Sequence, residues 1–199
     1  MSLRALPEGM RRFALDAIPP EPWRNGGGWA RTLASAADET GLLWRISVAD
    51  IELDGPFSIF DGMDRTAVLL DGPGLALTGA GAPIRFPAPG AVAAFPGEAE
   101  LRSQLGQGPA RLLNVMTRRG ASVGSVEICP ARCDFPPPGS AALLLAVDGR
   151  VDVNCAGGAL ELGVDPGEGL ELRGSPNSAS GAGATFRGTG LWVRVSIRC

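Results

Sequence analysis

The sequence contains no histidine, no lysine and no tyrosine, and these absences remove most of the side chains that transfer protons in enzymes. Carboxylates and thiols are the common groups that remain for general acid–base work. All 18 basic residues are arginines, and each carries a permanently charged planar group that suits carboxylates. The composition therefore favours binding of an anion over catalysis.

The chain also lacks a strong excess of either charge and any long apolar run. A net charge of −3 produces no field that would attract nucleic acid or anionic lipid. The apolar run at residues 141–147 is too short to span a bilayer, and no secretory signal follows Arg11 and Arg12. We therefore expect a cytoplasmic protein with neither a nucleic-acid nor a membrane partner.

The four cysteines are too scattered to form a metal site. Cys129 and Cys133 are separated by three residues, whereas Cys155 and Cys199 are isolated. No histidine and no second close pair complete a zinc site. We expect reduced thiols, and neither a metal nor any other cofactor.

Short β-strands are the dominant pattern along the chain. Apolar, β-branched and aromatic residues form brief runs bounded by Gly, Pro and Asp, which is typical of an all-β barrel or sandwich. Asp71-Gly72-Pro73-Gly74 and Asp148-Gly149 resemble hairpin turns, because Asp and Gly tolerate positive φ. The expected strands are 12–18, 28–34, 43–48, 65–70, 75–78, 91–95, 101–105, 110–118, 122–129, 142–147, 151–154, 159–162, 169–172 and 191–197.

A turn motif recurs and indicates an internal duplication. Residues 68–72 (Val-Leu-Leu-Asp-Gly) are echoed by residues 145–149 (Leu-Ala-Val-Asp-Gly), 77 positions later. Each copy leads to a Pro-Gly-Glu corner, at 96–98 and at 166–168, and ends in an alternating strand. This order is similar to the cupin pattern, a double-stranded β-helix closed like a jelly roll. Chance similarity of glycine-rich turns is the alternative.

Trp23-Arg24-Asn25-Gly26-Gly27-Gly28 is the most distinctive segment. An arginine fork and an amide, followed by three residues without side chains, can form a carboxylate cradle with inward-pointing backbone N–H groups. The equally weighted alternative is a bulge or a tight connection that needs glycine for steric reasons.

Three other segments carry candidate binding groups. Residues 44–49 alternate as a strand, which places Arg45 with Ser47 and Ala49 on one face; alternation alone favours the solvent side for that face. Asn114 shares its face with Leu112 and Met116, so it is either a satisfied structural amide or a ligand reader.

The third segment is the corner after Asp54. It places Phe57, Ser58 and Phe60 near Arg65, where the aromatic rings can form a pocket wall or close the end of a barrel. In the second case, Arg65 is an exposed neighbour of Asp64 and contributes little.

In series, these segments resemble the signature blocks of the HutD/Ves family: residues 23–28, 44–49, 54–58, 62–65, 96–98 and 114–120. The resemblance implies a bicupin of two RmlC-like double-stranded β-helix (jelly-roll) barrels. We place the first barrel, with its ligand pocket, at 1–120 and the second at 121–199, with strands that can exchange between halves. The implied ligand-binding residues are Trp23, Arg24, Asn25, Gly26, Gly27, Arg45, Phe57, Ser58, Phe60, Arg65 and Asn114.

The resemblance also implies a function. HutD genes accompany histidine-utilisation operons, and the family is regarded as regulatory, sensing an intermediate such as formylglutamate. We expect a small carboxylate or an N-acyl amino acid as ligand, and the sequence leaves a homodimer open. The alternatives are a metal-independent isomerase or amide hydrolase, using Asp54, Asp64, Glu98 or a thiol, and a protein-interaction module.

Overall fold

The computed structural model describes residues 6, 9–23, 26–129, 132–134, 141–155, 160–173 and 185–199, and nearly all of their regular structure is β-strand. The chain forms two compact units, one of residues 18–124 and one of residues 1–17 with 125–199. The first strand therefore groups with the second half, whereas the sequence placed it in a barrel of residues 1–120. Within the described ranges, the chain has no helix with the length and apolarity that a membrane crossing requires.

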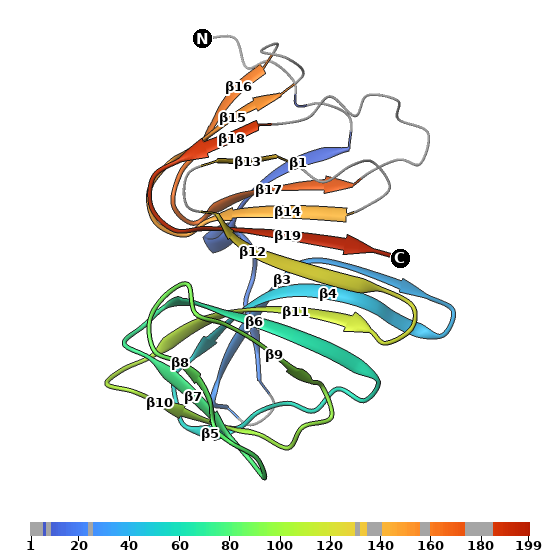
Figure 1. Ribbon diagram of the computed structural model, residues 1–199, viewed down its shortest axis with the longest axis vertical. Helices are drawn as coiled ribbons and strands as arrows, with labels where there is room; N and C mark the ends of the chain where they lie inside the picture. Colours follow the sequence, from blue (N-terminus) through green and yellow to red (C-terminus); the bar gives the residue numbers. More distant parts are fainter. Residues whose placement is uncertain are drawn as a thin grey trace. The chain divides into compact units, whose positions relative to one another are not determined.

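The N-terminal unit consists of two sheets that pack around one core (Figure 1). Its larger sheet has six strands, in the order β2 (Glu21–Pro22), β3 (Gly28–Asp38), β4 (Gly41–Ile51), β11 (Ala110–Arg118), β6 (Met63–Asp71) and β9 (Val92–Pro96). The smaller sheet has four, in the order β5 (Gly55–Pro56), β10 (Arg102–Leu105), β7 (Leu75–Thr78) and β8 (Ile84–Phe86). Buried side chains from both sheets, such as Leu69, Leu112, Leu77 and Phe86, fill the space between them.

The C-terminal unit repeats this arrangement. Its larger sheet has the order β1 (Met10–Ala14), β17 (Glu168–Arg173), β14 (Ala141–Ala146), β19 (Trp192–Arg198) and β12 (Val123–Cys129). Its smaller sheet has the order β13 (Arg132–Asp134), β18 (Thr185–Gly188), β15 (Val151–Cys155) and β16 (Leu160–Val164). A short 3-10 helix, Leu15–Ala17, follows β1 and replaces the end of the strand expected at 12–18.

The backbone hydrogen bonds show the duplication directly. Gly90 N–H donates to the Leu69 carbonyl at 2.8 Å, and Gly167 N–H donates to the Ala146 carbonyl at 2.9 Å. The donor and the acceptor of the second bond each lie 77 positions after those of the first. The chain is thus a bicupin, with the same order of strands in both halves.

One part of the expected repeat is wrong. The structural equivalent of the turn at 166–168, which precedes β17, is the turn at 89–91 before β9. The Pro-Gly-Glu at 96–98 instead follows β9. Pro-Gly pairs occur at many turns in a chain with 29 Gly and 17 Pro. The two identical Pro-Gly-Glu triplets therefore did not have to occupy equivalent places in the two barrels.

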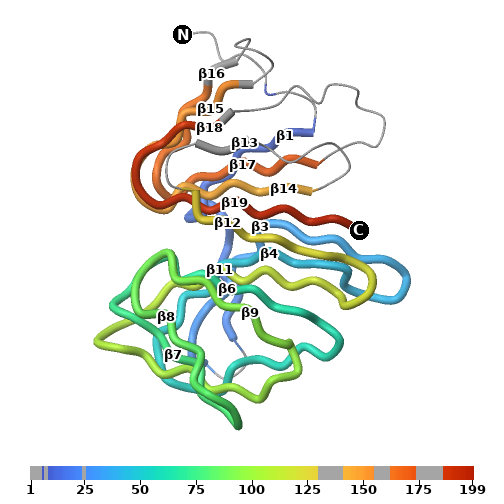
Figure 2. Tube along the Cα trace, in the orientation of Figure 1, coloured from blue at the N-terminus to red at the C-terminus, as the bar shows by residue number. Residues whose placement is uncertain are grey.

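The strand predictions are largely confirmed, with differences at the ends. The strands at 75–78 and 110–118 match β7 and β11 to the residue, whereas β3 and β4 extend as the long hairpin traced in Figure 2. Five short strands were missed: β2, β5, β8, β13 and β18. The two Asp-Gly turns are not hairpins, because β6 and β7 belong to different sheets, as do β14 and β15.

Candidate functional site

A cavity of about 680 Å³ opens in the N-terminal unit against one face of the six-stranded sheet. Strands β2, β3, β4, β6 and β11 line it, together with the segment that runs from β5 to Phe60. Seven of the predicted site residues lie in this lining: Trp23, Arg45, Phe57, Ser58, Phe60, Arg65 and Asn114.

Strand register creates the polar floor of the cavity, which we define as Arg45, Ser47, Arg65, Asn114 and Met116. Met116 on β11 pairs with Arg45 on β4 at one side and with Arg65 on β6 at the other. Two positions along β11, Asn114 pairs with Ser47. Since side chains alternate along a strand, all five project from the same face of the sheet.

Arg65 is the central group of this floor and is only 5% exposed. Its Nη1 donates to the Ser58 carbonyl at 2.9 Å, and its Nη2 donates to Asn114 Oδ1 at 2.8 Å. The guanidinium carbon lies 4.6 Å from the ring centroid of Phe57 and 5.0 Å from that of Phe95. Hydrogen bonds and aromatic faces thus fix the orientation of the cation.

Neither arginine of the floor has a carboxylate partner among the described residues. Nε of Arg45 and Nε of Arg65 are both buried without a hydrogen-bond partner. Burial lowers the pKa of the Arg65 guanidinium to about 10, which leaves it charged at neutral pH. Among the described residues, the cavity floor thus has two buried or half-buried cations and no carboxylate paired with them.

The direction of Arg45 differs from the one that alternation favoured. Arg45, Ser47 and Ala49 face the cavity, while Trp44, Ile46 and Val48 are buried on the opposite face of β4. Both faces of this strand are therefore covered. A period of two separates the faces, but it does not identify the one that lines a cavity.

Aromatic residues form the wall opposite the floor. The rings of Trp23 and Phe57 meet edge to face, with centroids 6.1 Å apart. Phe60 also lies close to the Arg65 guanidinium, 5.3 Å from ring centroid to Cζ. The prediction that this corner forms a pocket wall agrees with the geometry, and Arg65 is not the exposed residue of the alternative.

The glycine-rich loop is a tight turn in its described part. Gly26 has φ of 70° and donates its N–H to the Trp23 carbonyl at 3.0 Å, while the Gly27 carbonyl accepts from Glu52 N–H at 3.1 Å. A Cβ on Gly28 would lie 2.2 Å from the Asp50 carbonyl oxygen. Neither Gly26 nor Gly27 lines the cavity. Arg24 and Asn25 lie outside the described residues.

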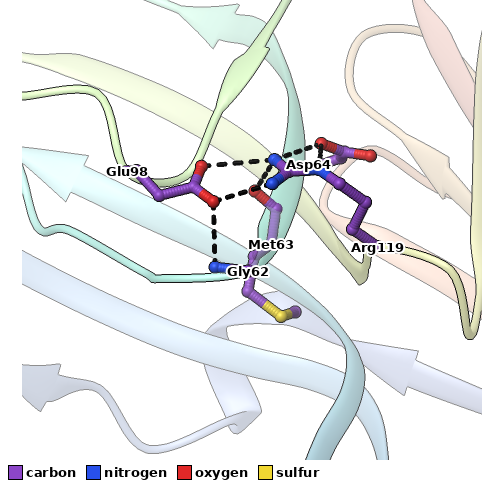
Figure 3. Close-up of polar contacts among 5 residues, drawn as sticks. All are labelled: Gly62, Met63, Asp64, Glu98 and Arg119. Carbon is purple, nitrogen blue, oxygen red and sulfur yellow. Dashed lines mark hydrogen bonds and ion pairs between the residues drawn. The ribbon is translucent and has the colours of Figure 1, made fainter.

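The carboxylates that the sequence named for acid–base work lie outside the cavity lining. Asp54 Oδ1 accepts from Leu105 N–H at 2.7 Å. Asp64 and Glu98 both accept from Arg119, at 2.7 and 2.8 Å (Figure 3). Each of these carboxylates therefore anchors a turn or a neighbouring strand.

The structure describes the side chains of two of the four cysteines. Cys129 is buried in the C-terminal core and Cys199 is exposed at the chain end, while the side chains of Cys133 and Cys155 lie outside the described residues. In the part of the chain that the structure describes, no three Cys, Asp or Glu side chains cluster to hold a metal ion.

Several residues of the cavity were not predicted as site residues: Glu21, Pro22, Ala30, Ser47, Ala49, Pro56, Ile59 and Met116. Ser47, Ala49 and Met116 share strand faces with Arg45 and Asn114, so the period of two could have identified them. Glu21, Pro22 and Pro56 lie on two-residue strands, for which the sequence holds no periodic signal.

The positions of the C-terminal unit that correspond to the cavity floor hold different side chains in the described residues. Ala142 stands at the position of Arg65, and Trp192 stands at that of Leu112. Trp192 is fully buried and packs against Phe186, with ring centroids 6.1 Å apart. Arg194, at the position of Asn114, forms an ion pair with Glu127. The described part of this barrel thus has a large apolar side chain and a paired charge where the first barrel has the floor of its cavity.

Comparison with known proteins adds the family. The family model described as HutD matches residues 16–180. An uncharacterized 21.2 kDa protein from the hutC 3' region of Pseudomonas putida is 33% identical over 141 residues, which is 70% of this chain and 74% of that protein. Protein Ves of Cronobacter sakazakii is 32% identical over 60% of this chain, and the match spans 66% of the Ves protein.

Solved structures share the fold. HutD from Pseudomonas fluorescens SBW25 superposes with a TM-score of 0.78 at 24% identity, covering 95% of this chain and 98% of that one. A conserved protein of unknown function from Pseudomonas aeruginosa PAO1 gives 0.80 at 24% identity, covering 96% and 99%. A cupin 2 conserved barrel domain protein from Leptotrichia buccalis gives 0.56 at 10% identity, covering 94% of each chain.

Proposed function

The chain belongs to the HutD family, and from this premise we propose that it is a regulatory, small-molecule-binding protein that holds a small carboxylate in the cavity of its N-terminal barrel. The ligand class is a small carboxylate or N-acyl amino acid, of which formylglutamate is an example. The protein acts in the cytoplasm.

The observation that carries the proposal is the pair of arginines on the cavity floor. Arg45 and Arg65 flank Met116 in the sheet, and neither forms an ion pair with a carboxylate of the described chain. Burying a cation without an anion is destabilising, so a protein that keeps buried Arg65 and half-buried Arg45 in one cavity has a use for their charge. Guanidinium groups bind carboxylates through paired N–H donors.

The dimensions and walls of the cavity fit a small organic anion. A volume of about 680 Å³ is within the usual range for small-molecule sites. Trp23 and Phe57 offer apolar surface to the carbon skeleton, while Arg45 and Arg65 receive the charge. Both the carbon skeleton and the carboxylate of such a ligand therefore contribute to the binding energy.

The link to histidine utilisation comes from the family and its genomic setting. The relative from Pseudomonas putida is named for its position beside hutC. Formylglutamate carries two carboxylates and an N-acyl group, which makes it a suitable probe for a floor with two arginines and an amide.

Isothermal titration calorimetry with formylglutamate tests the proposal. We expect saturable binding to the wild-type protein and binding about 10- to 100-fold weaker in Arg45→Gln, because a hydrogen bond to a charged group contributes roughly 1.5–3 kcal/mol. Arg45 is the better position for this test, since Arg65 also contacts three phenyl rings and its loss alters packing.

Arg85→Gln is the matched control. Arg85 is an exposed arginine on β8 of the same unit and does not line the cavity. We expect the Arg85→Gln variant to bind formylglutamate with the same affinity as the wild type. Equal affinity in all three proteins, or the same loss in both variants, would contradict the assignment of the anion to the cavity floor.

A further inference from the structure

The donors and acceptors on the cavity floor are unequally distributed. Arg45 and Arg65 can only donate hydrogen bonds, and each has a buried Nε without a partner. The Ser58 carbonyl lies in the lining, but it already accepts from Arg65 Nη1 at 2.9 Å. The floor therefore offers a ligand mostly N–H groups, beside the Ser47 hydroxyl, which can donate or accept.

Asn114 completes this pattern because its orientation is fixed by Arg65. A guanidinium has no acceptor, so the atom of Asn114 that faces it, at 2.8 Å, is the carbonyl oxygen Oδ1. The amide nitrogen then remains as the other end of the side chain, with two N–H donors for the cavity. Asn114 is 5% exposed and pairs with Ser47 in the sheet, so its donors lie over the same floor.

Glu21 is the carboxylate residue of the described cavity lining. Glu21 is on β2, at the edge of the sheet, and pairs with Ala30, which in turn pairs with Ala49. The two arginines lie on β4 and β6, on either side of β11. Strand β2 is therefore separated from β4, which carries Arg45, by one strand, and from β11, which carries Asn114, by two.

From this arrangement we propose that the floor of Arg45, Arg65 and Asn114 discriminates between an ionised carboxylate and the matching carboxamide, with Asn114 as the specificity-determining residue. The inference rests on the proposed function and sharpens its ligand class. A carboxylate offers two acceptor oxygens and no hydrogen, and thus satisfies the donors from both sides. A carboxamide of the same shape directs an N–H₂ group at donors that cannot accept it.

The size of the discrimination follows from unpaired polar groups. A site built around hydrogen bonds rejects an analogue that leaves its buried groups unpaired far more strongly than an apolar pocket rejects a wrong shape. The amide also loses the attraction of two cations for a negative charge. We therefore expect at least about a 100-fold difference in Kd.

The probes are formylglutamate and its two monoamides, N-formylglutamine and N-formylisoglutamine, compared by calorimetry at neutral pH. Each monoamide replaces one carboxylate and keeps the size of the molecule. At least one monoamide should bind about 100-fold or more weakly than the diacid. The monoamide that loses affinity identifies the carboxylate that lies on the floor.

Asn114→Asp tests the role of the amide. The new carboxylate would pair with Arg65, remove the N–H donors and present an acceptor to the ligand. We expect this variant to bind the diacid at least about 10-fold more weakly and to bind the rejected monoamide better than the wild type does. Asn154→Asp, on β15 of the other unit, makes the same chemical change away from the cavity and should leave the ranking of the three probes unchanged.

The outcomes separate this inference from the proposed function. Tight binding of the diacid, with both monoamides within about threefold of it, would overturn the discrimination and leave the carboxylate site in place. Binding of the diacid with an unchanged ranking in Asn114→Asp would remove Asn114 as the determinant. Failure of the wild-type protein to bind any of the three probes would overturn both.

Discussion

At the scale of single residues, the buried charge of Arg65 favours the binding of an anion but lowers the stability of the folded protein. Its guanidinium is buried beside Phe57, Phe60 and Phe95, and it donates two hydrogen bonds but pairs with no carboxylate of the described residues. The aromatic rings offset part of the cost of burying the charge. The remainder is a cost in stability that a bound carboxylate would remove.

We predict that Arg65→Met retains the fold and loses the ligand. The methionine chain would still pack between the phenyl rings, and removal of a buried cation offsets the loss of two hydrogen bonds. The free energy of unfolding, measured by chemical denaturation, should change by less than about 2 kcal/mol. Loss of the folded state, or wild-type affinity for formylglutamate in the folded variant, would contradict this view of Arg65.

The sequence indicated which residues line the cavity floor better than it indicated the contacts that each of them makes. Arg65 and Asn114 lay in recognisable segments, and the face shared by Asn114 and Met116 followed from alternation. The contact between Arg65 and Asn114 joins residues 49 positions apart, so only the pairing of β6 with β11 could reveal it. For Arg45, alternation correctly placed it on one strand face with Ser47 and Ala49. It favoured solvent for that face, whereas the face lines the cavity.

At the scale of elements, residues 57–63 connect the cavity wall to the rest of the barrel. Gly97 accepts a hydrogen bond from Phe60 N–H at 2.9 Å and donates one to the Met63 carbonyl at 2.7 Å. A Cβ on Gly97 would lie 2.3 Å from the Phe60 carbonyl oxygen. The absence of a side chain at Gly97 therefore permits the close approach that positions Phe57 and Phe60.

Gly97→Ala should displace this segment. We expect a loss of about 2–3 kcal/mol in the free energy of unfolding together with weaker ligand binding, because the wall and the Ser58 carbonyl move with it. Gly81→Ala is the control, since a Cβ there meets no atom within 4 Å, and it should change stability by no more than about 0.5 kcal/mol. Equal effects of the two substitutions would show that the contact at Gly97 does not hold the segment.

Arg119 holds the same segment from outside the cavity (Figure 3). Its guanidinium bonds to Asp64 and Glu98, and Glu98 Oε1 also accepts from Gly62 N–H at 3.0 Å. The bond from Arg119, aided by backbone N–H groups, lowers the pKa of Glu98 from 4.5 to about 2. A depressed pKa stabilises the folded state above the ordinary pKa of the carboxyl, and that stabilisation is lost as the pH falls towards 2.

The thermal midpoint of the wild type should therefore exceed that of Glu98→Gln by a small amount at pH 5–7, since the ion pair is exposed and screened. The two midpoints should converge as the pH falls from 4.5 to about 2. A difference that stays constant across this range would mean that ionisation of Glu98 does not support the segment.

The repeat shows what could and could not be predicted for elements. The Asp-Gly turns at 71–72 and 148–149 gave the correct offset of 77, because in each unit the turn joins the two sheets at the same point. The two Pro-Gly-Glu corners were matched wrongly, since their local sequences agree while their places relative to β9 and β17 differ. Strands of two to four residues, such as β2 and β8, are too short to carry a periodic signal.

At the scale of the whole molecule, the two units share one fold but differ in the side chains at equivalent positions. The N-terminal unit keeps a cavity with arginines on its floor, whereas the equivalent positions of the C-terminal unit hold Ala142 and the buried Trp192. The C-terminal unit also gains β1, which pairs with β17 from Met10 to Ala14. Under the proposed function, the N-terminal copy of the fold binds the ligand and the C-terminal copy gives structural support.

Phe13→Ala tests this division. Phe13 is buried on β1 and lies against Gly169, where a Cβ would come within 2.3 Å of its ring. Removal of the ring should cost about 3–5 kcal/mol in the free energy of unfolding. At a temperature where the variant is folded, its Kd for formylglutamate should stay within about twofold of the wild type, because the cavity lining lies entirely in residues 21–116. A large loss of affinity in the folded variant would show that the two units do not act independently.

The central claim is that an anion lies against Arg45 and Arg65, and nuclear magnetic resonance of the arginine Nε–H groups tests it most directly. Arg45→Gln and Arg65→Met assign the two signals, and Arg85 provides an exposed reference. With saturating formylglutamate, we predict that the Nε–H resonances of Arg45 and Arg65 shift while that of Arg85 does not. Saturable binding with both cavity resonances unchanged would contradict the claim.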